Sequence, residues 1–221
     1  MRYEERLQHL LSSAAIVFAD KGFHPTTMRD LAQSSGMSLA GMYYYVRSKD
    51  DLLHRIQDGV FAQVIAGARR VTSDASLPPE ERLRRFIRHH VTFFAAHMAE
   101  MKVLSHEAGS LTGEHLDAIN RLKRDYVGLL RGLLASVRRQ AVSDAEVGVA
   151  AYALFGMMNW IYTWYDPDGP VGPDRLAEQL AEIALRGAAQ ASADATAYGS
   201  DLPTPQRHEP PWAAAMHRSD A

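Results

Sequence analysis

Groups that donate hydrogen bonds to nucleic acids recur between positions 26 and 53, a stretch rich in hydroxyl and phenol side chains. Phosphate oxygens accept hydrogen bonds from Ser, Thr, Tyr and Lys, and base edges accept them in the grooves. Tyr43, Tyr44 and Tyr45 are consecutive, so on a helix they point in three directions, and one small unit cannot bury all three. At least one phenol is therefore expected to face outward. Packing in the core is the alternative role. It fits Tyr45, which is grouped with Met42 and Val46, better than it fits Tyr44.

Three helices must hold these donors in place. One of the two threonines at positions 26 and 27 can cap a first helix, with Asp30 near its positive end. Gly36 stands where a residue with positive φ would end that helix, and Ser38 can cap a second one over residues 39–45. Ser48, followed by an acid three positions later, can cap a third. The spacing predicts a helix-turn-helix followed at once by a longer helix.

A second group of side chains could bind a small molecule. Aromatic residues and methionines crowd positions 152–165 around a lone amide, Asn159, which needs a polar partner among apolar neighbours. Mostly apolar surroundings with a few polar groups are typical of small-molecule sites. Core and dimer packing is the alternative, although it fits Asn159 and Trp160 together less well. The group comprises Tyr152, Phe155, Met157, Met158, Asn159, Trp160, Tyr162, Trp164 and Tyr165.

Basic side chains crowd the first half of a helix predicted over residues 80–100. They form either a solvated face or an anchor for an anionic ligand. On the same helix, His89 and His97 share a face but lie roughly 12 Å apart, so they cannot bind one metal ion without a third ligand. A metal-responsive regulator is therefore a minor alternative. The basic residues are Arg82, Arg84, Arg85 and Arg88.

Apolar residues recur at helical spacing along the rest of the chain, so the sequence predicts an all-α fold. An N-terminal helix over residues 3–21 packs on the helix-turn-helix, and the helix that begins at residue 49 reaches about residue 71. Alanine, serine, aspartate and proline dominate after residue 188, and that tail is expected to be disordered. Further helices are predicted over residues 80–100, 101–108, 114–140, 144–165 and 174–187.

The interior of the predicted 144–165 helix carries no charge from residue 147 to residue 165. A membrane span is not expected, because glycine, asparagine and threonine dilute its apolarity and acidic residues flank both ends. A helix that is apolar all round is buried on several sides. Because one domain cannot cover every face of it, the last two helices are expected to form a homodimer interface.

Composition limits how the chain can act. It has 221 residues, 47% of them hydrophobic, no cysteine and a net charge of −2. Residues 1–55 hold seven basic and six acidic side chains, so DNA affinity would have to come from placed contacts and from the paired half-sites of a dimer. No secretory signal is apparent at the N-terminus, and a cytoplasmic location is expected.

Catalytic motifs are not found in the sequence. It contains no phosphate-binding glycine loop, no HExxH and no Gly-x-Ser-x-Gly elbow, and each of these would be needed for a familiar reaction class. A hydrolase with an added DNA-binding domain would need a nucleophile and a base that the sequence does not offer. We therefore expect a binding protein and not an enzyme, with no cofactor.

The residues of the helix-turn-helix match a known pattern. Gly36-Met37-Ser38, followed by Tyr43-x-Tyr45-x-x-Ser48-Lys49-Asp50-x-Leu52, resembles the DNA-binding domain of the TetR (tetracycline-repressor-like) family of bacterial transcription regulators. Ala40 stands where the family usually has glycine, and Leu39 where it often has a polar residue, so readout would rest on other positions. The resemblance implies a helix-turn-helix domain over residues 1–50, a larger helical domain for effector binding and dimerisation over residues 51–190, and a tail over residues 191–221.

This resemblance also gives the expected partners. A homodimer would grip a palindromic operator in double-stranded DNA and release it on binding an effector. Thr27, Ser38, Gly41 and Tyr44 would approach bases or nearby phosphates. Thr26, Tyr43 and Lys49 would position the DNA backbone.

A second resemblance covers roughly residues 80–187. Glu107, Arg121-x-x-x-x-Tyr126 and Asn159-Trp160-x-x-x-Trp164-Tyr165-x-Pro167-x-Gly169 are similar to the ligand domain of TetR-family regulators that respond to acyl-CoA thioesters and repress their degradation genes. It implies an apolar tunnel for the acyl chain and cations for the phosphates. A regulator of efflux that responds to a hydrophobic drug-like ligand is the main alternative. The expected effector-binding residues are Arg85, Arg88, His89, Phe93, Arg121, Tyr126, Asn159 and Trp160, and Lys123 and Arg124 are further candidates for the phosphates.

Overall fold

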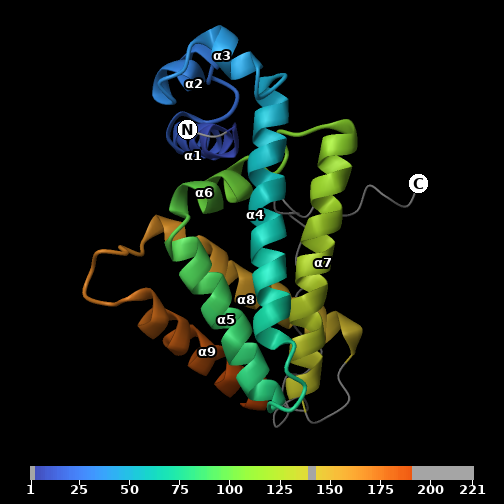
Figure 1. Cartoon of the computed structure of the whole chain (residues 1–221). Helices are drawn as coiled ribbons and strands as arrows, with labels where there is room; N and C mark the ends of the chain where they lie inside the picture. Colours follow the sequence, from blue (N-terminus) through green and yellow to red (C-terminus); the bar gives the residue numbers. More distant parts are fainter. Residues whose placement is uncertain (1–2, 139–142, 191–221) are drawn as a thin grey trace, which may run out of the picture. The chain divides into compact units, whose positions relative to one another are not determined.

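The computed structural model describes residues 3–138 and 143–190, and helices make up nearly all regular structure there (Figure 1). No strand occurs among these residues, so the predicted all-α fold is confirmed. Positions 139–140 of the predicted 114–140 helix and the predicted tail over residues 191–221 lie outside the described residues. The helices are α1 (Tyr3–Lys21), α2 (Met28–Ser34), α3 (Leu39–Tyr43), α4 (Lys49–Thr72), α5 (Pro79–Ala95), α6 (Met98–His106), α7 (Gly113–Val137), α8 (Asp144–Asn159), the 3-10 helix η1 (Trp160–Thr163) and α9 (Pro173–Gln190).

Local capping fixes where the short helices begin. Thr27 and not Thr26 caps α2: its hydroxyl accepts from the Asp30 N–H at 3.2 Å, and the Asp30 carboxylate accepts from the Thr27 N–H at 2.7 Å. Gly36 reverses the chain with φ +64°, a conformation that disfavours any residue with a Cβ. Ser38 then caps α3 by accepting from the Gly41 N–H at 3.0 Å. The predicted helix-turn-helix is therefore confirmed at the level of individual caps.

Two predicted helices are interrupted. The boundary between two helices was predicted after residue 100, yet α5 ends at Ala95, and His97 has the non-helical angles φ −135° and ψ 49° before α6 begins. The Ala96 N–H is shared between the carbonyls of residues 92 and 93, which tightens the last turn. The predicted 144–165 helix likewise ends at Asn159 and continues as the tighter η1. Periodicity does not reveal such breaks because the apolar spacing continues across them.

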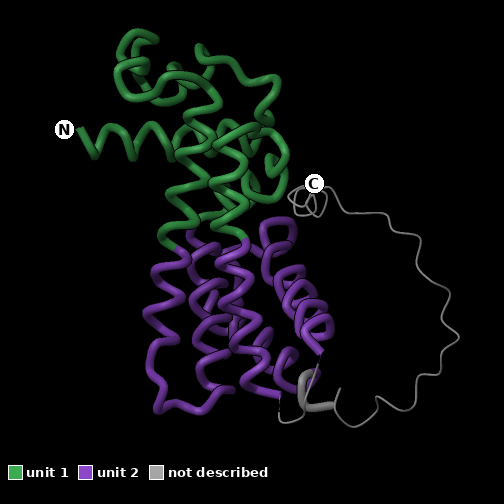
Figure 2. The backbone as a smooth tube through the Cα atoms, turned by 90° about the vertical axis from the view of Figure 1, so that its right-hand side faces the viewer, with its two compact units in different colours: residues 1–63, 97–123, 211–221 green, residues 64–96, 124–210 purple. Residues whose placement is uncertain are grey.

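The described residues form two compact units, which Figure 2 distinguishes along the backbone. Unit 1 comprises residues 3–63 and 97–123, and unit 2 comprises residues 64–96, 124–138 and 143–190. Helices α4 and α7 contribute residues to both. The units therefore interleave along the chain, with α6 and the first part of α7 in the same unit as the helix-turn-helix.

Unit 1 is built around the helix-turn-helix. Its core includes Leu10, Phe18, Leu31, Met42 and Leu52, each at most 2% exposed. Helix α6 packs against α1 in this unit.

The end of α6 is tied to the turn between α1 and α2 by the buried side chain of Glu107. Its carboxylate accepts from the Phe23 N–H at 2.9 Å and from the Ser110 hydroxyl at 2.6 Å. Gln57 of α4 donates to the Glu107 carbonyl at 3.2 Å. In unit 1, Glu107 thus holds the helix-turn-helix to α6.

Unit 2 is held by α5, α8 and α9. Leu83, Phe86, Ile87 and Val91 on α5 are fully buried, and α5 packs along α9. Charged side chains border this contact: Arg84 pairs with Glu178 at 2.6 Å and also with Glu182, while Arg88 pairs with Asp174 at 2.7 Å. Because these pairs lie at the surface, where water and salt screen them, the apolar contact dominates.

Helix α8 buries one apolar face and exposes another. Val147, Ala151, Leu154 and Phe155 are buried, whereas Val149 is 71% exposed. Among the described helices, none is both long enough and apolar enough to cross a membrane.

Candidate DNA-binding and effector sites

Helix α3 presents phenols to solvent, as predicted. Tyr43 is 50% and Tyr44 is 73% exposed, while Met42 beneath them is fully buried. The Tyr44 ring is braced edge-on by Tyr3 and Tyr45, with centroids 5.9 and 5.2 Å away. Bracing two sides of an exposed ring reduces the rotamer freedom that it would lose on binding. The arrangement holds a hydrogen-bond donor ready at the surface.

Ser38 and Gly41 act as one structural feature at the start of α3. The Ser38 hydroxyl accepts from the Gly41 N–H and is exposed, so its own proton can still be donated to a phosphate. A Cβ at position 41 would lie 3.0 Å from the Ser38 oxygen, which is tight enough to disturb the cap. Gly41 therefore keeps Ser38 in place, and no side chain projects from the surface of α3 at position 41. Thr27 is also exposed, although its hydroxyl donates to Asp30 at 2.8 Å.

The structure corrects the prediction for the Thr26 side chain. Thr26 is only 2% exposed, and its hydroxyl donates to the Gly22 carbonyl at 2.6 Å. It turns inward because the turn after α1 needs a donor for that carbonyl. The side chain consequently fixes the turn and is not presented to a phosphate.

Lys49 also has a structural role. Its ammonium donates to the carbonyls of Phe23, His24 and Thr26 at 2.8, 3.1 and 2.9 Å and lies 4.4 Å from the centroid of the Phe23 ring. All three ammonium hydrogens are therefore used within the chain. The predicted phosphate contact of Lys49 stays a prediction.

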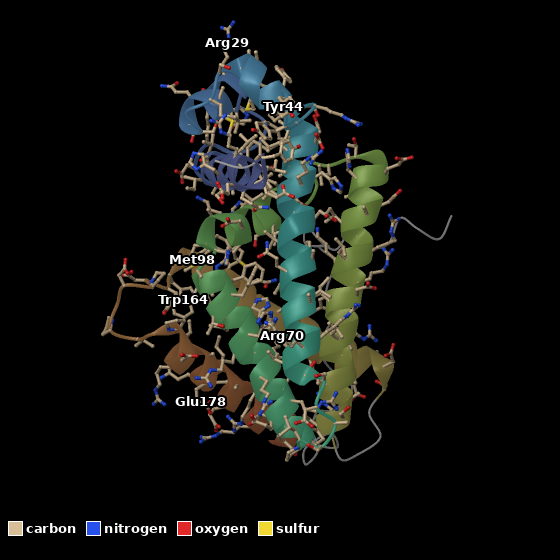
Figure 3. All side chains as sticks on the ribbon, in the orientation of Figure 1. Arg29, Tyr44, Arg70, Met98, Trp164 and Glu178 are labelled. Carbon is tan, nitrogen blue, oxygen red and sulfur yellow. The ribbon has the colours of Figure 1, made fainter. Side chains whose placement is uncertain are left out.

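One exposed cation was missed by the sequence reasoning. Arg29, in the first turn of α2, is exposed and projects outward from that helix (Figure 3). It forms no ion pair with any residue in the described part of the chain. Its position in the sequence could have identified it, because Arg29 lies just after the predicted start of a helix, and helix N-termini commonly bind DNA phosphates.

In unit 2 an aromatic cluster joins α5, α7 and α8; it consists of Phe86, His90, Phe94, Tyr126 and Phe155. His90 is 1% and Tyr126 4% exposed, and their rings lie parallel within 11° at a centroid distance of 5.8 Å. The Tyr126 hydroxyl lies 3.0 Å from Nδ1 of His90. The Phe155 ring contacts both, at 5.7 Å from His90 and 5.4 Å from Tyr126.

His90 is neutral in this setting. Burial among apolar rings lowers its pKa to about 3, with a smaller contribution from His89, and the amide of Asn159 opposes the shift. Burial also raises the pKa of Tyr126. The Asn159 side chain interacts with the His90 imidazole, yet Nε2 has no hydrogen bond of acceptable geometry among the described residues. The predicted site residues Tyr126 and Asn159 thus both interact with His90, which was not among the predicted effector-binding residues.

Other predicted effector residues lie outside the aromatic cluster. Trp160 is 57% and Trp164 is 59% exposed. Arg85 pairs with Glu81 at 3.0 Å, one turn away on α5, and Arg88 pairs with Asp174. Arg121 is exposed on the part of α7 that belongs to unit 1. Within unit 2, the structure therefore does not gather Arg85 and Arg88 beside His90.

His89 packs on α4 instead of entering the cluster. Its Nε2 donates to the Val64 carbonyl at 3.0 Å, and its ring covers Gly67, where a Cβ would come within 2.2 Å of the ring. Phe93 packs against His89 and Phe94, with centroids 6.0 and 5.1 Å away. Across residues 3–138 and 143–190, no three His, Asp or Glu side chains come together as a metal site requires.

Two family models match the chain. "Bacterial regulatory proteins, tetR family" matches residues 10–56, and "Tetracyclin repressor-like, C-terminal domain" matches residues 76–188, which is more than half of the chain. The chain belongs to the TetR family. This TetR-family protein is accordingly a transcription regulator with an N-terminal helix-turn-helix.

Individual relatives agree with this assignment. The HTH-type transcriptional repressor KstR2 of Mycolicibacterium smegmatis is 24% identical over 195 residues, covering 86% of this chain and 93% of KstR2. The TetR-family regulator PfmR of Thermus thermophilus has a TM-score of 0.71 at 28% identity, covering 80% of this chain and 97% of PfmR. AibR, solved in complex with isovaleryl coenzyme A and operator DNA, has a TM-score of 0.70 at 28% identity, again covering 80% of this chain and 97% of AibR.

Proposed function

We propose that this TetR-family regulator is a homodimeric repressor that leaves a palindromic operator when an acyl-CoA thioester binds to unit 2. The observation that carries the effector part is the buried aromatic cluster, because it surrounds the polar groups of His90 and Tyr126 with apolar rings. A few polar groups within apolar walls are typical of sites for largely apolar ligands. The likeness to AibR, which was solved with isovaleryl coenzyme A, supports the thioester class.

DNA binding rests on the exposed donors of unit 1. Tyr43, Tyr44 and Ser38 are exposed at α3, and Arg29 projects from α2. The low net charge of the region limits non-specific attraction. A dimer doubles the number of phosphate and base contacts, and its spacing restricts binding to sites with two correctly separated half-sites.

Dimerisation is supported by the outer face of α8. On α8, Val149 is 71% and Met157 36% exposed, and their spacing of eight residues places them on one side of the helix. Trp160, the first residue of η1, is 57% exposed. On α9, Ile183 is 56% exposed. An apolar stripe of this kind on a single chain indicates an interface, and a second copy of the chain is the occupant that symmetric oligomers favour.

Val149→Glu tests this interface. A buried glutamate on each subunit would shift the protein to monomers and abolish operator binding, as measured by sedimentation velocity and fluorescence anisotropy. Ile16→Glu is the matched control, because Ile16 is a 54% exposed apolar residue on α1 and its replacement should leave the dimer intact. A Val149→Glu protein that remains dimeric would exclude this face.

A cation for the CoA phosphates is proposed to come from the part of α7 that belongs to unit 2. Arg124 is exposed there and forms no ion pair with any described residue, whereas Arg85 and Arg88 are already paired with carboxylates. Unpaired guanidinium groups bind phosphates without first losing another partner. We therefore favour Arg124 over the arginines of α5.

Operator fragments selected from genomic DNA by the purified protein provide the decisive assay. Isovaleryl-CoA or octanoyl-CoA is then added, with CoA alone and the free acids as controls. A true effector releases the fragment and raises the melting temperature. At 100 times its Kd it adds about 2.7 kcal/mol to the free energy of unfolding. If neither thioester does so, the effector belongs to another class, and an uncharged drug-like ligand becomes the leading choice.

A further inference from the structure

The aromatic cluster of unit 2 contains one buried polar atom without a partner. His90 is 1% exposed. The rings of Phe94, Tyr126 and Phe155 contact its imidazole, and Phe86 contacts Tyr126. Nδ1 lies 3.0 Å from the Tyr126 hydroxyl, and Nε2 is the atom left unbonded. Leaving a buried polar atom unbonded costs about 1–3 kcal/mol, so such atoms in native proteins call for an explanation.

The contact with Tyr126 determines which nitrogen of His90 carries the proton. A neutral imidazole has one N–H and one bare nitrogen. If Nδ1 carried the proton and donated to Tyr126, the phenol proton and the bare Nε2 would both lack partners among the described residues. If Tyr126 donates to Nδ1, the N–H at Nε2 is the one group of this pair that lacks a hydrogen-bond partner among the described residues. The second arrangement leaves fewer buried groups unsatisfied, so Nε2 is a donor.

Besides Tyr126, Asn159 is the polar side chain that interacts with the His90 imidazole. Its amide influences the ionisation of His90, but its geometry does not satisfy Nε2. Asn159 closes α8 at the point where the chain tightens into η1, and it is only partly buried. A ligand atom at Nε2 would therefore have the carboxamide beside it as a second polar contact.

We propose that the N–H at Nε2 of His90, with the Asn159 carboxamide beside it, binds an uncharged carbonyl oxygen of the effector. This inference rests on the proposed function and assigns the thioester carbonyl of an acyl-CoA to His90. The acyl chain then lies among the phenylalanine rings of the cluster.

The charges around His90 indicate why the oxygen is uncharged. The side chains that interact with its ring are Tyr126, Phe94, Phe155 and Asn159, and none of them is a cation. The adjacent His89 has a pKa lowered by burial, so it supplies no fixed positive charge. A carboxylate in this position would be buried without a counter-ion, whereas a carbonyl oxygen needs only the single donor that His90 offers.

A matched pair of ligands tests the inference on the unaltered full-length protein. Octanoyl-CoA is compared with S-octyl-CoA, the thioether in which a methylene replaces the carbonyl, by isothermal titration. The pair is repeated with isovaleryl-CoA and its thioether. Each thioester should bind about 5- to 100-fold more tightly than its thioether, because the thioether leaves Nε2 unsatisfied.

Two variants assign this preference to His90. The double variant His90→Phe with Tyr126→Phe removes both hydrogen-bonding partners together, so it keeps an apolar core without a new unpaired hydroxyl. It should bind both members of a pair with equal affinity. Tyr126→Phe alone retains the imidazole, so it should keep most of the preference for the thioester. Nitrogen-15 spectra of histidine-labelled protein report the tautomer directly, and His90 should carry its proton on Nε2.

Each alternative result overturns a different statement. Equal binding of thioester and thioether by the unaltered protein would exclude carbonyl recognition, even if both release the operator. A preference that survives in the folded double variant would assign recognition to another residue, as would a proton on Nδ1 in the spectra. If neither member of either pair binds, the acyl-CoA proposal itself is wrong, and the thioester assignment fails with it.

Discussion

Replacing Lys49 with methionine separates a structural role from a DNA contact. Methionine keeps the aliphatic length of the side chain and removes the ammonium. In the folded chain that ammonium joins the carbonyls of Phe23, His24 and Thr26. The substitution therefore leaves the turn between α1 and α2 without its central donor.

The size of the effect follows from the exposure of the three carbonyls. Hydrogen bonds that involve a charged donor contribute about 1.5–3 kcal/mol each, but they are not additive. The bond to His24 is exposed, so water can replace it, whereas the bonds to Phe23 and Thr26 are partly buried. We expect a loss of about 2–4 kcal/mol in the free energy of unfolding. For a chain of this length, this corresponds to a fall in Tm of roughly 4–16 °C.

Lys49→Arg is the matched control. It keeps the positive charge that a phosphate would attract, but a planar guanidinium cannot direct donors at three converging carbonyls as a tetrahedral ammonium does. The structural role predicts that arginine restores little of the lost stability. A phosphate contact predicts that arginine restores most of the operator affinity in the protein that remains folded.

Urea unfolding and salt-dependent operator binding measure the two roles separately. Removal of one phosphate-binding cation lowers the slope of log Kd against log salt concentration by about 0.9. Our reasoning requires a clear drop in stability for Lys49→Met with little change in this slope. It is refuted if Lys49→Met unfolds at the same urea concentration as the parent while the slope falls by that amount per subunit.

Three further predictions concern single contacts. Gly67→Ala should lower the free energy of unfolding in urea by about 1–3 kcal/mol, because its Cβ would come within 2.2 Å of the His89 ring. Adding His89→Ala should recover part of this loss. Strictly additive effects of the two substitutions would exclude the contact. Tyr44→Phe should weaken operator binding about 5- to 30-fold in anisotropy titrations without lowering Tm, because it removes only an exposed hydroxyl; unchanged affinity would exclude that donor. Hydrogen bonds from Lys21, followed by those from Thr27, hold the pKa of Asp30 well below its ordinary 3.8. The Asp30 carboxylate therefore stabilises the folded chain at pH values above this ordinary pKa, and that stabilisation is lost as the pH falls below it. Asp30→Asn should make the free energy of unfolding depend less on pH in that acidic range.

Features that depend on neighbouring residues could be predicted from the sequence. Each cap of the helix-turn-helix is formed within four positions, as at Ser38, whose partner is the N–H of Gly41. Ser143 caps α8 in the same way, with Glu146 completing the box. The local order of residue types therefore determines where these helices start.

Choices between equivalent neighbours could not be predicted in the same way. Thr26 and Thr27 are both suited to cap α2, and only the buried carbonyl of Gly22 decides that Thr26 turns inward. The apolar pattern places His90 on the buried side of its helix, but it does not reveal that the His89 ring covers Gly67 on α4. These decisions depend on contacts between distant segments, which a periodic pattern does not encode.

The arginines of α5 show how this limit affects the proposed site. Their sequence fits either a solvated face or an anion anchor, because both need only a row of cations on one side of a helix. In the folded chain Arg84 and Arg88 face the carboxylates of α9, so binding a phosphate there would first require breaking those pairs. That exchange gains little, since one anion replaces another. The affinity for an anionic CoA would thus have to come from cations without a carboxylate partner, and in unit 2 Arg124 on α7 meets that condition.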